Sequence, residues 1–409
     1  MHGCELLVGG DGNVIRSRFF EAVMRSHARM TYTDVAKILV EGNQKLAQKY
    51  AELMPHLQNL YELYKVMRQQ RELRGAMDFD TQETKIVFGK ERKIEEIVPV
   101  VRNDAHKLIE EFMITANTAA AKFLKRKKMP HLLRIHDGPG KEKLLALKTF
   151  LSELGLHLGG GENPSPLDYM YLLDSVKGRK DAHLIQTVLL RSMSQAVYSP
   201  ENKGHFGLAL DAYAHFTSPI RRYPDLLVHR AIRHVLAGKA GDSFAYGFPD
   251  MVQLGEHCSA NERRADEATR DVVNWLKCEY MMDKIGQEFP GIITAVTGFG
   301  FFVELQSIYV EGLVHIASLH QDYFNYDAAS HHLYGERTGV RYRLGDAVRV
   351  KVVRVNLDDK KIDFELIQSA KKTAKSVPKA TVEKSAKGKT VKQENSGKAK
   401  SKTKRRRKT

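Results

Sequence analysis

Apolar and polar positions alternate over residues 4–25, on both sides of a stretch rich in glycine and Asn/Asp at residues 9–13. This pattern predicts a β-hairpin whose turn lies at that stretch. A two-stranded hairpin needs further strands or a helix to bury its apolar face, so we expect a further segment upstream. A helical period follows over residues 33–74, with Pro55 suited to a first helical turn and Gly75 to a stop. The expected stripe of this helix contains Leu57, Leu60, Tyr64 and Met67.

A second helix is predicted over residues 103–126. The apolar face that we expect it to bury consists of Ile109, Phe112, Met113, Ala116, Ala120 and Phe123. On the same helical wheel, Glu110 and Asn117 lie beside each other at the edge of this face, with His106 close by. Glu111 is expected to point to the far side. Further helices are predicted over residues 140–155, 166–198, 224–237 and 256–285.

The pattern changes near residue 287 to five short strand-like segments. These segments are GIITAV, GFFVEL, YVEGLVHI, AVRVKVVRV and KIDFELI. They predict a small five-stranded barrel with a longer connection over residues 320–345. From residue 369 the chain has almost no apolar side chains, so we expect it to be disordered. The predicted fold class is therefore α+β, with a mainly helical part that has β-elements (1–286), a barrel (287–368) and a basic tail (369–409).

Composition excludes several classes of protein. No apolar run approaches the roughly 18–20 residues that a membrane span requires, and the first residues do not form a signal peptide. The three cysteines are odd in number, far apart and without a C-x-x-C pair, which argues against a disulfide framework or a structural zinc site. We therefore expect a monomer in the cytoplasm, away from membranes.

The net charge of +16 points to a polyanionic partner, but the charge is unevenly distributed. Residues 371–409 carry sixteen lysines and arginines against two acids, so the rest of the chain is only about +2. We expect this tail to contact RNA or the ribosome without regard to sequence, and such contacts weaken with salt. Lysine runs are also commonly just a solvated surface.

The segment with the most chemical information is GHFGLALDAYAHFTSPIRRYPDLLVHR at residues 204–230. Pro219 and Pro224 stiffen the backbone on either side of Arg221 and Arg222. A planar guanidinium matches the oxygen atoms of a phosphate group, so a stiffened pair of arginines is suited to phosphate recognition. Composition alone favours a loop with solvent-exposed arginines.

The complete string resembles the signature near the end of the RNB domain in the RNase II/ribonuclease R family. The resemblance extends to SRFFEAVMRSHARMTY, RNDAHKLIEEFMITAN and ERRADEATRDVVNWLKCEY, and so to nearly the whole chain. It implies the C-terminal portion of a processive 3′→5′ exoribonuclease that acts on the 3′ ends of single-stranded RNA and releases 5′-mononucleotides.

The resemblance also implies roles for individual residues. Tyr32 matches an active-site tyrosine close to the scissile phosphate, and Arg221 matches an arginine that stabilises charge on that phosphate. Glu110 matches a glutamate at the terminal nucleotide, while Phe79 matches an aromatic residue that clamps the terminal bases. Arg222 is assigned to RNA binding. Without the resemblance, the aromatic residues could equally be core side chains and Glu110 a solvated carboxylate.

The barrel sequences GIITAVTGFGFFVEL and EGLVHIASL resemble an S1 domain, which is an RNA-binding OB-fold. The resemblance implies that Phe299, Phe302 and His315 face RNA, where aromatic rings can stack on unpaired bases. Lys360 would add positive charge near Asn356, a position where the pattern often has aspartate. The alternative is a barrel that binds protein.

The family hydrolyses RNA with two metal ions, so the resemblance implies Mg²⁺ held by a cluster of aspartates. The chain contains no D-x-D-D arrangement, and its nearest dyad, Asp358-Asp359, is better interpreted as a turn. We therefore expect the metal-binding aspartates and the cold-shock-like N-terminal domains to lie upstream of this sequence. Two hypotheses remain: a part of an exoribonuclease, or a truncated RNA-binding protein that does not cut. A third, a translation-associated RNA-binding factor, is opposed by TSPIRRYPDLLVHR.

Overall fold

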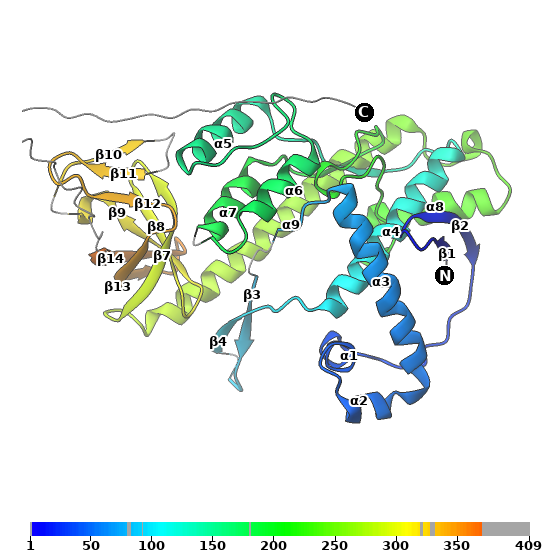
Figure 1. Ribbon diagram of the computed structural model, residues 1–409, viewed down its shortest axis with the longest axis horizontal. Coiled ribbons are helices and arrows are strands. Elements are labelled where there is room, and N and C mark those ends of the chain that lie inside the picture. Colours follow the sequence, from blue (N-terminus) through cyan, green and yellow to red (C-terminus); the bar gives the residue numbers. More distant parts are fainter. Residues whose placement is uncertain are drawn as a thin grey trace, which may run out of the picture. The chain divides into compact units, whose positions relative to one another are not determined.

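A computed structural model of the protein describes residues 2–79, 83–91, 93–179, 181–319, 322–327 and 332–369 (Figure 1). Residues 1–370 form one compact unit. The predicted tail, apart from residue 369, lies outside the described residues. The fold class is α+β, as predicted, with a mainly helical part followed by a closed barrel. Within the described part, no helix is both long enough and apolar enough to cross a membrane.

The N-terminal hairpin is confirmed. Strands β1 (His2–Val8) and β2 (Val14–Glu21) pair antiparallel, with an irregularity between Leu7 and Val8. Phe19 on β2 is buried against residues of α4 (Asp104–Arg126) and α8 (Tyr223–Leu236). The hairpin therefore buries part of its apolar face on helices.

The predicted helix over residues 33–74 is interrupted. It consists of α1 (Tyr32–Leu39), α2 (Gln44–Lys49) and α3 (Met54–Arg74). Pro55 lies in the first turn of α3, and Gly75 ends the helix with a φ of 81°, a left-handed conformation that glycine adopts without strain. Both of these local signals were interpreted correctly.

The remaining helices follow the pattern with shifted boundaries. They are α5 (Lys141–Glu153), α6 (Pro166–Ser175), α7 (Ala182–Ser192) and α9 (Phe248–Met282). The single helix predicted over residues 166–198 is thus two helices. Helix α9 begins earlier than residue 256, because Pro249 lies in its first turn and Asp250 accepts a hydrogen bond from the Gly247 amide at 2.7 Å.

The predicted buried face of α4 is confirmed only at Ala120 and is otherwise displaced around the helix. Its buried residues are Ala105, Leu108, Glu111, Ile114, Asn117, Ala119, Ala120, Ala121 and Leu124. Ile109 is 40% exposed, whereas Glu111 is only 3% exposed instead of pointing away. The physical reason is a charged partner, because the buried guanidinium of Arg71 on α3 pairs with Glu111.

Two small sheets complete the helical part. Strands β3 (Thr84–Phe88) and β4 (Ile94–Pro99) form an antiparallel hairpin, and β5 (Leu133–Ile135) pairs antiparallel with β6 (Val197–Ser199). Ile97 of β4 belongs to the hydrophobic cluster that forms the barrel core.

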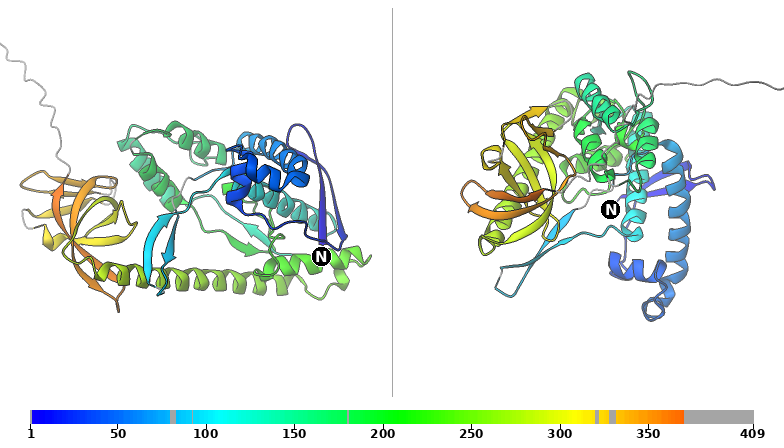
Figure 2. Two further views of the ribbon diagram at one scale, coloured as in Figure 1. Left: turned by 90° about the horizontal axis from the view of Figure 1, so that it is seen from below. Right: turned by 60° about the vertical axis from the view of Figure 1, so that its left-hand side comes forward.

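The five predicted barrel strands are present. They are β7 (Glu288–Thr297), β8 (Gly300–Leu305), β9 (Glu311–His315), β13 (Ala347–Asn356) and β14 (Lys361–Ser369), and they close in the order β13-β14-β9-β8-β7. Phe301, Val303 and Leu305 share one face of β8 and are fully buried in the barrel core. The connection after β9 contains a further sheet of β10 (Phe324–Asp327), β11 (His332–Gly335) and β12 (Arg341–Arg343). Cys278 and Met281 near the end of α9 join the barrel core, and Figure 2 shows this long helix reaching the barrel.

Candidate nucleic-acid site

Four residues that organise the candidate site lie on one side of helix α4. His106, Glu110, Met113 and Asn117 follow one another at intervals of four, three and four residues, so they lie in one row along the helix. We call this row the α4 row. At 1.5 Å per residue it extends over about 16 Å.

At one end of the α4 row, Asn117 anchors the loop that carries Arg221 and Arg222. The Asn117 carboxamide oxygen accepts hydrogen bonds from the backbone amides of Phe216 at 2.8 Å and Thr217 at 3.2 Å. Its amide nitrogen donates to the hydroxyl of Tyr213 at 2.9 Å. Asn117 is almost fully buried, so these hydrogen bonds are well protected from water. The loop is therefore fixed to α4 a few residues before Arg221.

The two arginines of this loop have different surroundings. Arg222 forms a two-point ion pair with the buried Asp225, at 2.9 Å from Nη2 to Oδ1 and 2.8 Å from Nε to Oδ2. Asp225 Oδ1 also accepts from the Ser218 amide at 2.7 Å, which ties the loop to α8. Arg221 is exposed, and within the described residues its guanidinium has no hydrogen bond or ion pair. Arg222 thus holds the loop, whereas Arg221 is available to an anion. A direct RNA contact by Arg222 stays a prediction.

Tyr32 lies at the His106 end of the α4 row. It is the first residue of α1, directly after the cap residue Thr31, whose hydroxyl oxygen accepts from the Asp34 amide at 3.1 Å. The Tyr32 ring is stacked on His106, with 4.1 Å between centroids and 22° between planes, and it is 46% exposed. Burial and the nearby charge of Arg102 both lower the pKa of His106. The imidazole is therefore neutral at pH 7, and this aromatic contact carries no positive charge.

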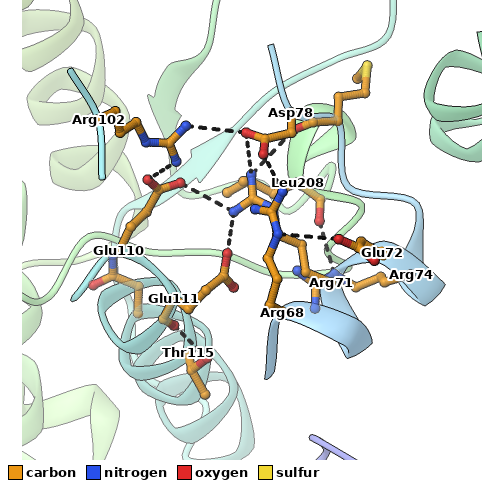
Figure 3. Close-up of polar contacts among 12 residues, drawn as sticks. Arg68, Arg71, Glu72, Arg74, Asp78, Arg102, Glu110, Glu111, Thr115 and Leu208 are labelled. Carbon is orange, nitrogen blue, oxygen red and sulfur yellow. Dashed lines mark hydrogen bonds and ion pairs between the residues drawn. The ribbon is translucent and has the colours of Figure 1, made fainter. Parts of the chain in front are cut away.

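Glu110 belongs to a network of three arginines and four carboxylates (Figure 3). The arginines are Arg68, Arg71 and Arg102, and the carboxylates are Glu72, Asp78, Glu110 and Glu111. Arg71 donates to Glu110 at 3.3 Å and to the buried Glu111 at 2.7 Å, while Arg102 also pairs with Glu110. Burial raises the pKa of Glu111, and the positive charge of Arg71 opposes that shift. Because Arg71 is only 4% exposed, it holds both glutamates from within the protein.

The same network reaches the segment that carries Phe79. Asp78 pairs with Arg68 and, at 3.3 Å, with Arg102. Burial alone would raise the pKa of Asp78, but these guanidinium groups hold the pKa below its usual value. Phe79 itself is half-buried and packs against a hydrophobic cluster that includes side chains of α5, α6 and α7. The ring is thus placed next to the network, though not as a freely exposed surface.

A row of four rings, three of them half-buried and one buried, includes residues just before the loop that carries Arg221. His136, His205, Tyr213 and His215 follow one another at centroid distances of 5.0, 5.4 and 5.6 Å. Burial lowers the pKa of His205 to about 3 and that of His215 to about 2. These histidines are neutral packing groups at physiological pH. The sequence interpretation missed this row, although His205 and His215 stand beside aromatic residues in the signature segment.

The barrel brings together three of its four predicted RNA-facing residues. Phe299, Phe302 and Lys360 line a cleft of about 510 Å³ together with residues of α9. The two phenylalanine rings meet edge to face at 6.2 Å, and Phe299 is 50% exposed. Lys360 pairs with Asp271 of α9, a partner that the sequence interpretation missed. His315 is exposed but lies outside the lining, and its Nδ1 accepts from the Ala317 amide at 3.1 Å.

No metal site emerges from the described part of the chain, where no group of three or more His, Cys, Asp or Glu side chains could hold an ion. Asp358 and Asp359 donate from their backbone amides to Asn356 Oδ1 at 3.0 and 3.1 Å. That dyad has the turn geometry that the sequence indicated. The described residues therefore do not fit Mg²⁺.

The sequence of the chain matches two family models. They are the RNB domain over residues 2–238 and the S1 RNA binding domain over residues 282–367. The chain belongs to the RNB family of 3′→5′ exoribonucleases, which generally depend on divalent metal ions. The predicted family and barrel type are thus confirmed, whereas the boundaries at residues 286 and 368 stay predictions.

The chain is similar to ribonuclease R of several bacteria. The chain is 52% identical over 393 residues to ribonuclease R of Escherichia coli (strain K12), with 94% of this chain and 48% of the relative covered. The apo form of Mycoplasma genitalium RNase R matches with a TM-score of 0.83 and 25% identity, over 90% of this chain and 57% of that one. The same enzyme in complex with ribose methylated single-stranded RNA matches with a TM-score of 0.82 and 26% identity, over 89% and 57%. The chain spans about half the length of the curated relatives it matches.

Proposed function

We propose that this chain forms the RNA-end-binding part of a processive 3′→5′ exoribonuclease, which releases 5′-mononucleotides from single-stranded RNA. The observation that supports the proposal best is the α4 row. It connects Tyr32, which stacks on His106, with Glu110 and with the loop that carries Arg221, which Asn117 anchors. Residues of three separate segments are thereby attached to one side of a single rigid helix.

The chemistry of each group suits a different part of the RNA end. The unpaired guanidinium of Arg221 can meet the last phosphodiester and stabilise negative charge as its bond breaks. Tyr32 can donate a hydrogen bond to the same phosphate. Glu110 can accept hydrogen bonds from the hydroxyl groups of the terminal ribose, and Phe79 can stack on a base through the part of its ring that is not packed. In this proposal Arg222 acts as a positioning residue for Arg221.

The barrel extends the contact along the strand. Phe299 and Phe302 offer aromatic surface for stacking on unpaired bases, at about 1–3 kcal/mol for each base by alanine substitution. Lys360 can exchange Asp271 for a phosphate group, and His315 adds a further contact outside the cleft. We expect cytoplasmic single-stranded RNA 3′ ends as partners, and we keep the ribosome or structured RNA as a proposed partner of the tail.

The metal requirement limits what this chain can do by itself. Hydrolysis in this family generally depends on divalent ions, and we propose Mg²⁺. Because the described residues contain no ligand set for it, binding and charge stabilisation are the contributions that we assign to this chain.

The purified chain is expected to bind RNA but to release little or no mononucleotide when Mg²⁺ is added. The measurement is gel analysis of a labelled single-stranded RNA over time. The matched control is a chimera in which the remaining part of E. coli ribonuclease R precedes this chain. The proposal is supported if the chimera releases nucleotides and the chain by itself does not. Mg²⁺-dependent release by the chain itself would contradict the prediction, and an inactive chimera that still binds RNA would favour the RNA-binding alternative.

Deleting the residues after 368 is expected to flatten the salt dependence of RNA affinity, because the tail has a net charge of +14. Each phosphate contact that is lost should reduce the slope of log K against log salt by about 0.7 for single strands. Titrations at several salt concentrations measure this slope. A slope that does not change on deletion would exclude the tail from RNA binding.

A further inference from the structure

A second cationic surface lies on another side of α4. It is a cleft of about 510 Å³ between the β1–β2 hairpin and helices α3 and α4. Five of its lining residues are cations: Arg16, Arg74, Lys122, Lys125 and Arg126. No carboxylate is among the lining residues. The cleft is therefore strongly positive, although the chain outside the tail is nearly neutral.

These cations are not neutralised by the protein. Among the described residues, none of the five has a carboxylate partner, and Arg126 reaches only the hydroxyl of Ser17 at 3.5 Å. By contrast, Arg68 and Arg71 of α3, and Arg102 just before α4, are all paired with carboxylates. Unpaired like charges that gather in one cleft repel each other, and an anionic ligand relieves that repulsion.

Arg74 is the cation least exposed to water. Its Nε donates to the backbone carbonyl of Leu208 at 3.1 Å (Figure 3). Burial lowers the pKa of Arg74. A partly buried guanidinium whose described partner is a neutral carbonyl gains from an anion that offers further acceptors.

The walls of the cleft are held in place. The hairpin tip lies directly on α3, since a Cβ at Gly12 would come within 2.8 Å of the Val66 carbonyl oxygen. Gly12 has a φ of 79°, and Gln70 donates to the side-chain oxygen of Asn13 at 3.2 Å. The tip of the hairpin therefore cannot be pushed closer to α3, and the cationic wall of α4 faces a fixed partner.

The cleft is separate from the candidate nucleic-acid site. Lys122 is five residues after Asn117, which places it about 140° around the helix from the α4 row. A ligand in the cleft would thus occupy a different side of α4 from the one that carries His106 and Glu110.

We propose that this cleft binds the phosphate groups of an RNA strand at a second site outside the candidate catalytic region. Guanidinium, ammonium, hydroxyl and carboxamide groups around the cleft can all donate to phosphate oxygens. No aromatic side chain is among the lining residues, so base stacking on rings gives no sequence preference. The cations come from three elements, namely the hairpin, α3 and about one turn of α4, which favours several phosphates of one strand over a single anion. The inference goes beyond the proposed nuclease function and does not depend on it.

The test uses the full chain with Lys122→Gln, Lys125→Gln and Arg126→Gln combined, because all three side chains are exposed and their loss should leave the fold intact. The control combines Lys141→Gln, Lys143→Gln and Lys239→Gln, which removes the same charge at exposed positions outside the cleft. Circular dichroism checks that both variants are folded. Affinity for a fluorescent single-stranded RNA of twelve nucleotides is then measured against salt.

The cleft variant is expected to lose at least about tenfold in affinity at low salt and about two units of salt slope, at roughly 0.7 per phosphate. The control should lose less than about twofold. Adenosine monophosphate is added as a competitor to distinguish the phosphates of an RNA strand from that of a free nucleotide. If a free nucleotide occupies the cleft, the cleft substitutions should also weaken the binding of adenosine monophosphate. Equal losses for the two variants would overturn the proposal. So would a cleft variant that binds RNA normally but no longer binds polyglutamate, since that result would assign the cleft to an acidic protein.

Discussion

Replacing Arg221 with alanine in the chimera is expected to slow RNA hydrolysis by about 10²- to 10³-fold while weakening RNA binding much less. A fixed hydrogen-bond donor aimed at developing negative charge stabilises a transition state by about 3–4 kcal/mol in other hydrolytic sites. Arg221 is exposed, has no protein partner among the described residues, and sits on a loop that Asn117 and Asp225 both hold. Single-turnover rates and separate affinity measurements give the two effects.

Two matched variants make this result specific. Arg221→Lys retains the charge but not the planar fork, so it should recover only part of the rate. Lys239→Ala removes an exposed cation just beyond the end of α8 and should leave the rate unchanged. If Arg221→Ala reduces rate and affinity by the same factor, the arginine only holds the RNA and the proposed role in the transition state is wrong.

Arg71→Met is expected to destabilise the chain by about 3–5 kcal/mol, because it leaves the buried carboxylate of Glu111 without its counter-charge. Chemical denaturation followed by circular dichroism measures the change. The double variant Arg71→Met/Glu111→Leu should recover most of the loss, since both buried charges are then absent. A double variant no more stable than the single one would mean that packing around Arg71, and not the ion pair, supports the fold.

The loss in Arg71→Met should also depend on pH. Burial raises the pKa of Glu111 in the folded chain, and removal of Arg71 takes away the main opposing influence. A carboxyl whose pKa is raised on folding binds protons more readily in the folded state. Its contribution is therefore retained at low pH and lost as pH rises through the folded pKa. Lowering the pH from neutral towards 5 should reduce the difference between Arg71→Met and the unchanged chain.

The local signals in the sequence predicted many elements correctly because they act over a few residues. The turn-rich stretch before Val14, the proline in the first turn of α3 and Gly75 at its end all have their expected structures. The segment GFFVEL was also predicted correctly as a barrel strand, which is β8. Each of these signals depends on neighbours along the chain.

The errors occur where a distant charge decides the outcome. Helix α4 buries Glu111 because Arg71, forty residues earlier, lies on the facing side of α3. The clue was present, since the stripe through Tyr64 and Met67 continues to Arg71, and a cation in such a stripe requires a buried partner. Asp271 as the partner of Lys360 had no such clue, because nothing in either segment indicates that α9 and the barrel hairpin approach each other.

Helix α9 is 35 residues long, or about 52 Å at 1.5 Å per residue, and it is continuous. Ser259 in its first half accepts a hydrogen bond from the Tyr198 amide, and Met281 near its end is part of the barrel core. The number of residues in α9 therefore fixes both the distance and the relative rotation between the parts of the protein that pack at its two ends. One residue added to its exposed middle would rotate the barrel end of the helix by about 100° about the helix axis. Seven added residues would restore that rotation almost completely, although they would lengthen the helix. Evolution of this chain should thus tolerate changes of residue type in that stretch far better than changes in residue number.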